Sequence, residues 1–259
     1  MDRAGPRHYP AVGMPTLEIP VDSVAAAELA GTLADRLEVC SDLAAEGWSP
    51  DAWLVREIRA RTPANVVAMI RPRASGTLAS LGAEAFRCTP AILDLCLREI
   101  ETLARAGAHG VAIGPLAGTQ GVDHHACGRM IEVARAHGLE VSFLRTFDLI
   151  VDREQAARDV CELGFDRLLT AGVPGWDASA HPLQERLAGV AATISIAQVA
   201  CQRLSRPALQ VMPCGGVRAS NAADWLKITP HLHASCRRGT WLDAQEVRDL
   251  RAAMGPRTA

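Results

Sequence analysis

One recurring pattern constrains the fold of this chain more than any other feature. A helical stretch is followed by a glycine, two or three small or polar residues, and a short apolar run. The pattern occurs in AAELAGTLADRLEVC, ETLARAGAHGVAIGPL, EVARAHGLEVSFLR and DVCELGFDRLLTAG. A glycine that can adopt positive φ ends a helix, and a continuous apolar run is typical of a parallel strand buried on both faces. Each copy therefore predicts a helix followed by a strand of a parallel sheet.

The remaining apolar runs complete the series of predicted strands. Their expected starts are Leu17, Leu37, Val66, Val111, Val141, Leu168, Leu209 and His231. Each segment between two strands is long enough for one crossover helix. Eight βα units in about 250 residues are typical of a TIM barrel, so the predicted fold class is α/β with a single (β/α)8 barrel. Alternating elements do not by themselves exclude a doubly wound open sheet, which is the alternative.

The domain organisation follows from composition along the chain. The opening residues MDRAGPRHYPAVGMPT are rich in proline, glycine and charge, so we predict a mobile tail over residues 1–16. No proline- or serine-rich linker interrupts the later elements, so residues 17–259 are expected to form one barrel domain. The connection Ala74–Pro90 is longer than a crossover needs and is a candidate lid over the barrel mouth.

Net charge and cysteine content limit the binding partners and the cellular compartment that we expect for this chain. With a formal net charge of −2, the chain lacks the excess of basic residues that is typical of proteins that bind nucleic acid or anionic membranes. No apolar run is long enough to span a bilayer. The eight cysteines show no C-x-x-C spacing, which favours free thiols in a reducing cytoplasm over disulfides or structural zinc. Lys227 is the only lysine, which leaves little room for Schiff-base chemistry. We therefore expect a cytoplasmic protein with neither nucleic-acid nor membrane partners.

Two near-repeats, LEIPVD and LEVCSD, place acidic residues inside the first two predicted strands. The side-chain period of two puts Glu18 and Glu38 on the same face of neighbouring strands. The outer face lies beneath helices, where an unpaired carboxylate is costly, so we expect both glutamates at the barrel mouth. Two close carboxylates push their pKa values apart, so that one can donate and the other accept a proton near neutral pH.

Polar residues at the other strand ends are further candidates, because a TIM barrel carries its site at the carboxyl ends of the strands. Arg71, Arg73 and Arg145 could hold an anion through bidentate hydrogen bonds. Asp148 could orient one of these arginines, and His233 could serve as an acid. The remaining predicted substrate-binding residues are Thr170, Gly215, Gly216 and Ser235. The glycine pair could present backbone amides to a phosphate or carboxylate, although a plain strand-to-helix turn explains it equally well.

These candidates favour an enzyme that moves protons on a small anionic substrate, as lyases, isomerases and hydrolases do. Glu38 or Glu18 would be the base, and the other carboxylate or His233 the acid. The alternative is structural, since Glu–Arg pairs inside such barrels can simply fill space. No nucleotide fingerprint or complete metal cluster calls for a cofactor.

The ordered motifs LE-x-x-VDS, DRLEVCSDLAAEGWSP, IRPR, F-x-RTFD, R-LLTAG, MPCGGVR-x-SN and H-x-S resemble those of the CutC family. The resemblance runs from Leu17 to about Arg238, and it implies a TIM barrel, a homodimer or higher homo-oligomer, and a role in copper homeostasis. Family members have been associated with copper(I) through one cysteine on each of the first two strands. Those positions are Pro20 and Cys40 here, so the resemblance leaves Cys40 as the candidate metal ligand.

The chain also departs from the family pattern at the predicted mouth. Leu144 stands where the family carries a histidine, which removes a proton carrier from the fifth strand. Cys214 and Cys236 could join Cys40 in a replacement thiol site, although buried cysteines without a function are the commoner explanation. The competing hypothesis to the enzyme is therefore a copper(I)-binding protein without turnover.

Overall fold

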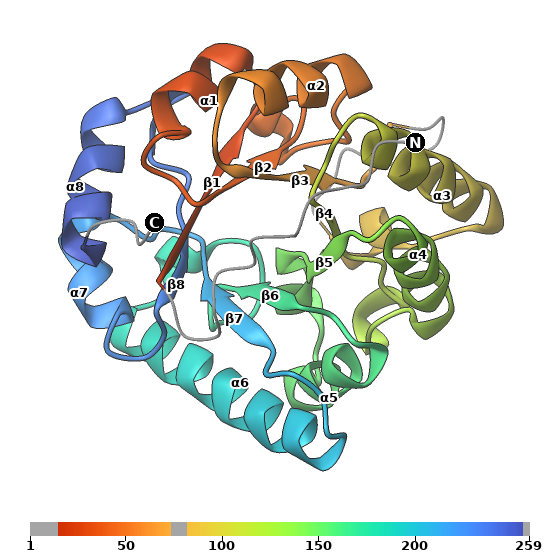
Figure 1. Cartoon of the computed structure of the whole chain (residues 1–259). Coiled ribbons are helices and arrows are strands. Elements are labelled where there is room, and N and C mark those ends of the chain that lie inside the picture. The colour runs from red at the N-terminus through yellow and green to blue at the C-terminus, as the bar shows by residue number, and fades with distance from the viewer. Residues whose placement is uncertain (1–14, 74–81, 256–259) are drawn as a thin grey trace.

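The computed structural model describes residues 15–73 and 82–255, which form a parallel barrel enclosed by helices (Figure 1). The strands of the barrel are β1 (Thr16–Val21), β2 (Arg36–Val39), β3 (Asn65–Met69), β4 (Gly110–Ile113), β5 (Glu140–Phe143), β6 (Arg167–Thr170), β7 (Gln210–Pro213) and β8 (His231–His233). Hydrogen-bonded neighbours run in the order β7-β6-β5-β4-β3-β2-β1-β8. The predicted (β/α)8 TIM barrel is confirmed, and the doubly wound sheet is excluded.

A helix follows each strand and covers the outside of the barrel. The helices of the described ranges are α1 (Val24–Ala30), α2 (Ala52–Arg61), α3 (Pro90–Arg105), α4 (His124–Ala136), α5 (Arg153–Leu163), α6 (Leu183–Arg203), α7 (Ala222–Trp225) and α8 (Ala244–Met254). Each predicted strand start agrees with the observed one to within one residue. None of the described helices combines the length and apolarity that a membrane span requires.

The glycines of the repeated pattern end helices as expected. Gly107, Gly138 and Gly164 have φ of +96°, +71° and +84°, conformations that side chains with a Cβ rarely adopt. Gly31 is the exception, because it ends α1 with an ordinary φ of −66°. A side chain is nevertheless excluded at Gly31, since its Cβ would lie 2.7 Å from the carbonyl oxygen of Ala27.

Two predicted segments lie largely outside the described residues. Residues 1–14 contain most of the predicted tail, and β1 begins at Thr16. Residues 74–81 contain the first half of the candidate lid. The second half holds a short 3-10 helix, η2 (Ala83–Phe86), followed by α3. The Thr89 hydroxyl caps α3 by accepting a hydrogen bond from the Ile92 amide, and Pro90 occupies the first turn.

The register of β1 and β2 determines which side chains enter the barrel. Glu18 lies beside Arg36, and Pro20 lies beside Glu38. The alternate residues, such as Leu17, belong to the apolar core beneath the helices. The prediction that the first two strands are neighbours and turn their glutamates inward is therefore confirmed. The expected place at the barrel mouth is wrong for Glu18, because Arg36 binds its carboxylate deeper in the barrel.

Four buried charged side chains fill the N-terminal end of the barrel interior, and we call this group the charged plug. Arg36 Nε donates to Glu18 Oε2 at 2.8 Å, and Arg36 Nη1 donates to Glu140. Arg167 Nη1 donates to the same Glu140 oxygen at 2.9 Å. Gly110 provides the space for this group, because a Cβ there would lie 3.0 Å from the Glu140 carbonyl oxygen. Alternating signs let each charge in the plug lie beside an opposite one.

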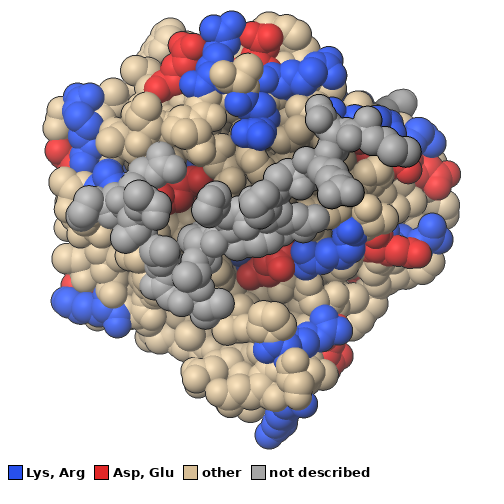
Figure 2. Space-filling view, in the orientation of Figure 1, with Lys and Arg blue, Asp and Glu red and all other residues tan. Residues whose placement is uncertain are grey.

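The outer surface contrasts with this ordered interior. On the face shown in Figure 2, acidic and basic side chains are interspersed around the rim. Several pairs at the surface, such as Arg61 with Glu57, join residues one turn apart in a single helix. Their charges remain in contact with water, so they contribute little to stability.

Replacing Arg36 with methionine tests the charged plug. Arg36→Met should lower the free energy of unfolding by about 3–5 kcal/mol, because it leaves the carboxylates of Glu18 and Glu140 buried without their shared partner. Urea unfolding followed by circular dichroism measures the loss. Arg61→Met is the matched control, and its unfolding free energy should stay close to that of the wild type. Similar losses in both variants would contradict a special role for the plug.

Candidate functional site

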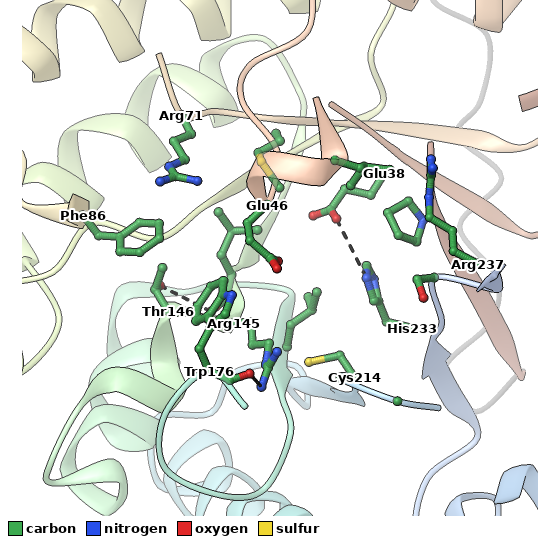
Figure 3. A pocket seen from close by; sticks show the side chains of 18 of the residues that line it. Glu38, Glu46, Arg71, Phe86, Arg145, Thr146, Trp176, Cys214, His233 and Arg237 are labelled. Carbon is green, nitrogen blue, oxygen red and sulfur yellow. Dashed lines mark hydrogen bonds and ion pairs between the residues drawn. The ribbon is translucent and has the colours of Figure 1, made fainter. Parts of the chain in front are cut away.

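A pocket of about 440 Å³ opens at the carboxyl ends of the strands (Figure 3). Its charged lining residues are Glu38, Glu46, Arg71, Arg145, Arg218, His233 and Arg237. Phe86 and Trp176 supply an aromatic wall, with ring centroids 5.9 Å apart. Arginines outnumber carboxylates in this lining, so the pocket has the charge that suits an anionic ligand.

Glu38 and His233 face each other on the floor of this pocket. His233 Nε2 lies 3.9 Å from Glu38 Oε2, while Glu38 Oε1 is buried without a hydrogen-bond partner among the described residues (Figure 3). Burial raises the pKa of Glu38 to about 7, and the charge of Glu18 adds to this rise against the opposing charges of His233 and Arg36. Glu38 can therefore gain or lose a proton near neutral pH.

Glu18 holds His233 from beneath and does not line the pocket. Glu18 Oε1 lies 2.9 Å from His233 Nδ1, and the other carboxylate oxygen accepts from Arg36. Burial opposes the charged form of Glu18, but Arg36 and His233 together hold its pKa well below the usual range. Although burial also opposes a charged imidazole, the hydrogen bond to Glu18 and the charge of Glu38 raise the pKa of His233. The charged plug thus orients the histidine and favours its protonated form.

Arg71 is a buried cation, and no carboxylate among the residues that the structure describes lies at hydrogen-bonding distance from it. Its residue is 6% exposed, and the guanidinium carbon lies 4.2 Å from the ring centroid of Trp48 and 4.8 Å from that of Phe86. Nη1 donates to the Gly47 carbonyl at 3.1 Å, whereas Nε and Nη2 have no partner within the described ranges. Burial lowers the pKa of Arg71, partly offset by the charge of Glu46. An anion entering the pocket could satisfy these two donor atoms.

Arg145 is held by the side chain expected to orient it. Its Nε donates to Asp148 Oδ2 at 3.2 Å, and its Nη2 donates to the Trp176 carbonyl at 2.7 Å. Asp148 is buried beside the pocket, where it also accepts from Thr170 Oγ1 at 2.5 Å. Burial raises the pKa of Asp148 to about 6, although Thr170 and Arg145 act against this rise. Asp148 and Thr170 therefore support Arg145 and do not line the pocket themselves.

Three of the other predicted substrate-binding residues lie together in the pocket lining. Gly215, Gly216 and Ser235 line the pocket, next to Arg218 and Arg237. Gly215 has φ +69°, and a Cβ there would lie 3.1 Å from the guanidinium carbon of Arg145. This glycine is thus explained by the close packing of Arg145 as well as by its turn.

Arg73 lies outside the pocket. Its side chain is 61% exposed and pairs with Asp42 at 2.6 Å. The two arginines of the IRPR motif therefore differ, since Arg71 is buried in the pocket wall and Arg73 is on the surface.

Several residues of the site were not predicted from the sequence. Arg36 and Glu140 could have been found, because each begins a strand and lies two residues before another inward-facing position. Phe86 ends the short helix η2, Trp176 lies in the connection between β6 and α6, and Arg237 begins the two-residue strand β9 (Arg237–Arg238). These segments are too short or irregular for a periodic signal to place a side chain at the pocket.

The residues present do not fit the copper(I) site implied by the family resemblance. Cys40 is buried, directs its thiol toward the Val21 carbonyl at 3.7 Å, and does not line the pocket. Burial raises the pKa of Cys40 well above its ordinary value, which disfavours the thiolate that a soft metal needs. Pro20, at the position of the other family cysteine, lines the pocket without a ligand atom.

The replacement thiol site does not assemble either. Cys214 lines the pocket, but Cys40 and Cys236 do not. Among the residues that the structure describes, three or more histidine, cysteine or acidic side chains nowhere gather in a geometry suited to a metal ion.

Comparison with known proteins identifies the relatives of this chain. The sequence model of the CutC family matches residues 16–237. A family protein CutC of Caulobacter vibrioides is 32% identical over 241 residues, which cover 92% of this chain and 87% of the relative. A CutC relative from Vibrio parahaemolyticus is also 32% identical, over 82% of this chain and 77% of its own length.

Solved structures share the barrel at lower sequence identity. The candidate copper homeostasis protein CutC from Streptococcus agalactiae matches with a TM-score of 0.70 and 21% identity, over 86% of this chain and 99% of that structure. The 3-hexulose-6-phosphate synthase from Salmonella typhimurium matches with a TM-score of 0.62 and 15% identity, over 92% of this chain and 98% of the synthase. At these identities the likeness concerns the fold.

The raised pKa of Glu38 predicts a pH-dependent stability difference. Between pH 4.5 and about 7, the folded protein keeps a proton on Glu38 that the unfolded chain has released, so the wild type loses stability as the pH rises through this window. Glu38→Gln lacks this loss and should gain stability relative to the wild type from pH 5 to pH 8. Urea unfolding at both pH values measures the change.

Glu132→Gln is the control for this experiment, because its side chain lies on the surface beside Arg129. Its stability relative to the wild type should be similar at pH 5 and pH 8. A Glu38→Gln variant that behaves in the same way would show that Glu38 does not titrate as described.

Proposed function

The chain belongs to the CutC family, and we propose that it is an enzyme that binds a small anionic molecule and transfers protons through Glu38 and His233. One observation carries the proposal: these two side chains meet in a pocket where Arg71 keeps two unpaired donor atoms within the described ranges. A titratable carboxyl group beside a cationic binding site suits elimination, isomerisation or hydrolysis.

Each side chain of the floor has a proposed role. Glu38 is the base, because it lines the pocket, has one oxygen without a hydrogen-bond partner among the described residues, and has a pKa of about 7 that allows both protonation states. His233 is the acid, since Glu18 binds Nδ1 and leaves Nε2 directed toward Glu38. Glu18 is a positioning residue in this proposal, because it lies beneath the pocket and is already bound by Arg36.

The anion would be held from two sides. Arg71 offers Nε and Nη2, and the rings of Trp48 and Phe86 lie against its guanidinium and keep it in place. Arg145 lines the same pocket and is fixed by Asp148 and the Trp176 carbonyl. Preorganised donors of this kind can also stabilise negative charge that develops on a substrate.

Copper binding is not favoured by the side chains present. The cysteine pair of the family is reduced to Cys40, which lies outside the pocket with a raised pKa. We therefore derive no role for copper here and retain the acid–base enzyme as the proposed function. All eight cysteines are unpaired as thiols, which supports the cytoplasmic location that we also propose.

The two arginines of the IRPR motif provide a matched test of anion binding. Arg71→Met should weaken binding by about 10- to 100-fold, because it removes charge-assisted hydrogen bonds from a buried site. Arg73→Met should bind like the wild type, since Arg73 is on the surface. The measurement is thermal stabilisation by inorganic phosphate, acetate, succinate and glycerol phosphate, followed by calorimetry for any that bind. Equal behaviour of the two variants would contradict the proposed anion site.

Proton transfer can be tested with any anion that binds. If it carries an acidic C–H group, the wild type should exchange that hydrogen for deuterium in heavy water, as seen by proton NMR. Glu38→Gln should bind the same compound but lose the exchange, because it lacks the base. Binding without exchange in the wild type, across the compounds that bind, would indicate a binding protein and not an enzyme.

A copper(I) titration tests the alternative function. Under anaerobic conditions with a competing chelator, the wild type and Cys40→Ser should show the same affinity for copper(I), because the Cys40 thiol is buried and protonated. Stoichiometric binding that disappears in Cys40→Ser would overturn this expectation and favour copper handling.

A further inference from the structure

A buried arginine holds the loop after β7 from behind. Arg186 lies near the start of α6 and is 6% exposed. Its Nη2 donates to the Cys214 carbonyl oxygen at 3.1 Å and to the Gly215 carbonyl oxygen at 2.6 Å. The Trp225 ring also lies against this guanidinium, with 5.3 Å between the ring centroid and the guanidinium carbon. Arg186 is absent from the pocket lining, and the acid–base chemistry proposed above gives it no role.

The next carbonyl group of the loop is also bound by a side chain. Asn221 Nδ2 donates to the Gly216 carbonyl oxygen at 3.0 Å. No backbone amide of the described ranges donates to the carbonyl groups of residues 214 and 215. The three successive carbonyl groups of residues 214–216 therefore bind side chains that lie outside the pocket lining.

The amides of the two glycines point away from Arg186. The C=O and N–H groups of a trans peptide unit point in opposite directions, and the described residues contain no cis peptide bond. Because the Cys214 carbonyl turns toward Arg186, the Gly215 N–H group points to the opposite side. The Gly216 N–H group does the same, because it shares a peptide unit with the second carbonyl that Arg186 binds.

These two amides are free on the side of the pocket. Within the described ranges, neither the Gly215 nor the Gly216 N–H group has an acceptor. Both glycines line the pocket, whereas Arg186 does not, so the side opposite Arg186 is the pocket side. Their φ angles of +69° and +104° are conformations that residues with a Cβ rarely adopt. The glycine pair thus permits a backbone direction that Arg186 then fixes.

We propose that Arg186 is a positioning residue that turns the Gly215 and Gly216 amides into the pocket, where they bind the phosphate group of a small phosphate ester. Successive backbone N–H groups that face one way form an anion-binding concavity, and a phosphate has enough oxygens to accept from both. The inference rests on the proposed function, because it takes the same pocket as the ligand site, and it names the class of anion.

Arg145 places a positive charge beside these amides. Its guanidinium carbon lies 3.1 Å from the position that a Cβ on Gly215 would take. Arg218, two residues beyond the glycine pair, lines the pocket as well. Asp148 is bound by Arg145 at 3.2 Å and by the Ala171 amide at 2.8 Å, so its charge is already compensated. This side of the pocket therefore suits a phosphate, which two guanidinium groups can hold together with the amides.

The rest of the ester would extend to the pocket floor. Cys214, the residue before the glycine pair, lies on the same side of the pocket as Arg145 and His233 (Figure 3). A phosphate on the loop would thus place the attached carbon skeleton beside the proposed acid and base. Arg71 lies across the pocket in this view and could bind a second polar group of the same molecule.

Nuclear magnetic resonance can follow the two amides one by one. Gly216 is the only glycine that follows a glycine in the sequence, and only Gly215 and Gly128 follow a cysteine. Nitrogen-15 glycine combined with carbonyl-labelled glycine or cysteine therefore selects their signals. On titration with glycerol phosphate, the Gly215 and Gly216 signals should shift and saturate together. Gly128 on α4 should not move, and glycerol alone should shift none of the three.

Replacing Arg186 tests its positioning role in the full-length protein. Arg186→Met should weaken glycerol phosphate binding by about 10-fold or more in calorimetry and should abolish the paired amide shifts, because the loop carbonyls lose their donor. Arg186→Lys can still donate to these carbonyls and should bind more tightly than Arg186→Met. Arg203→Met, at the exposed end of the same helix, is the matched control and should bind like the wild type. Urea unfolding verifies that each variant is folded.

The possible results separate this inference from the proposed function. Glycerol phosphate that binds without moving the Gly215 and Gly216 signals overturns the inference, whether or not Arg186→Met folds. Unchanged affinity in Arg186→Met also overturns it. If no phosphate compound binds but succinate binds in a manner that depends on Arg71, the inference fails and the proposed anion site stands. Paired amide shifts without any proton exchange on bound ligands would support the phosphate subsite and contradict the enzyme.

Discussion

The alternating charges inside the barrel are the interaction on which the rest of this structure depends. From Arg167 through Glu140, Arg36 and Glu18, each buried side chain lies beside one of opposite sign, and the series continues to His233. A buried charge without a partner is strongly destabilising, so the members of the series require one another. The series ends at the pocket floor, where Glu38 faces the last imidazole and keeps one oxygen unpaired among the described residues. The chemistry proposed for the pocket thus depends on residues that no ligand touches.

The strands and the inward glutamates could be predicted from the sequence because both follow from periodicity. The helix–glycine–strand pattern recurs, and the period of two along a strand decides which residues share a face. The partners of those glutamates were harder to predict. Glu18 was expected at the barrel mouth, but Arg36 on the adjacent strand binds it in the charged plug. That pairing depends on strand register, which a single sequence does not specify.

The aromatic part of the pocket could not be predicted for a different reason. Trp48, Phe86 and Trp176 come from the segments that join each strand to the following outer helix, and their positions depend on how those segments fold over the barrel. The position of Arg73 was also not predictable. Arg73 shares the IRPR motif with Arg71, but it lies on the surface. Its neighbour Arg71 turns inward because it continues the inward face of β3 from Met69. Alternation would place both arginines on one face, because they are two residues apart, so the exposure of Arg73 follows from its position four residues beyond the end of β3 and its pairing with Asp42.

The backbone hydrogen bonding that joins neighbouring strands of the barrel is interrupted at one place in the described residues. Within the described residues, β8 is hydrogen bonded to β1 along its length, whereas β7 and β8 touch without a backbone ladder. His233 is on β8 and Cys214 follows β7, so this seam reaches the pocket wall. Sliding of one strand past the other would break no backbone hydrogen bonds of a shared ladder. At this seam the pocket wall is therefore held by packing between the strands, while Glu18 keeps the imidazole anchored to β1.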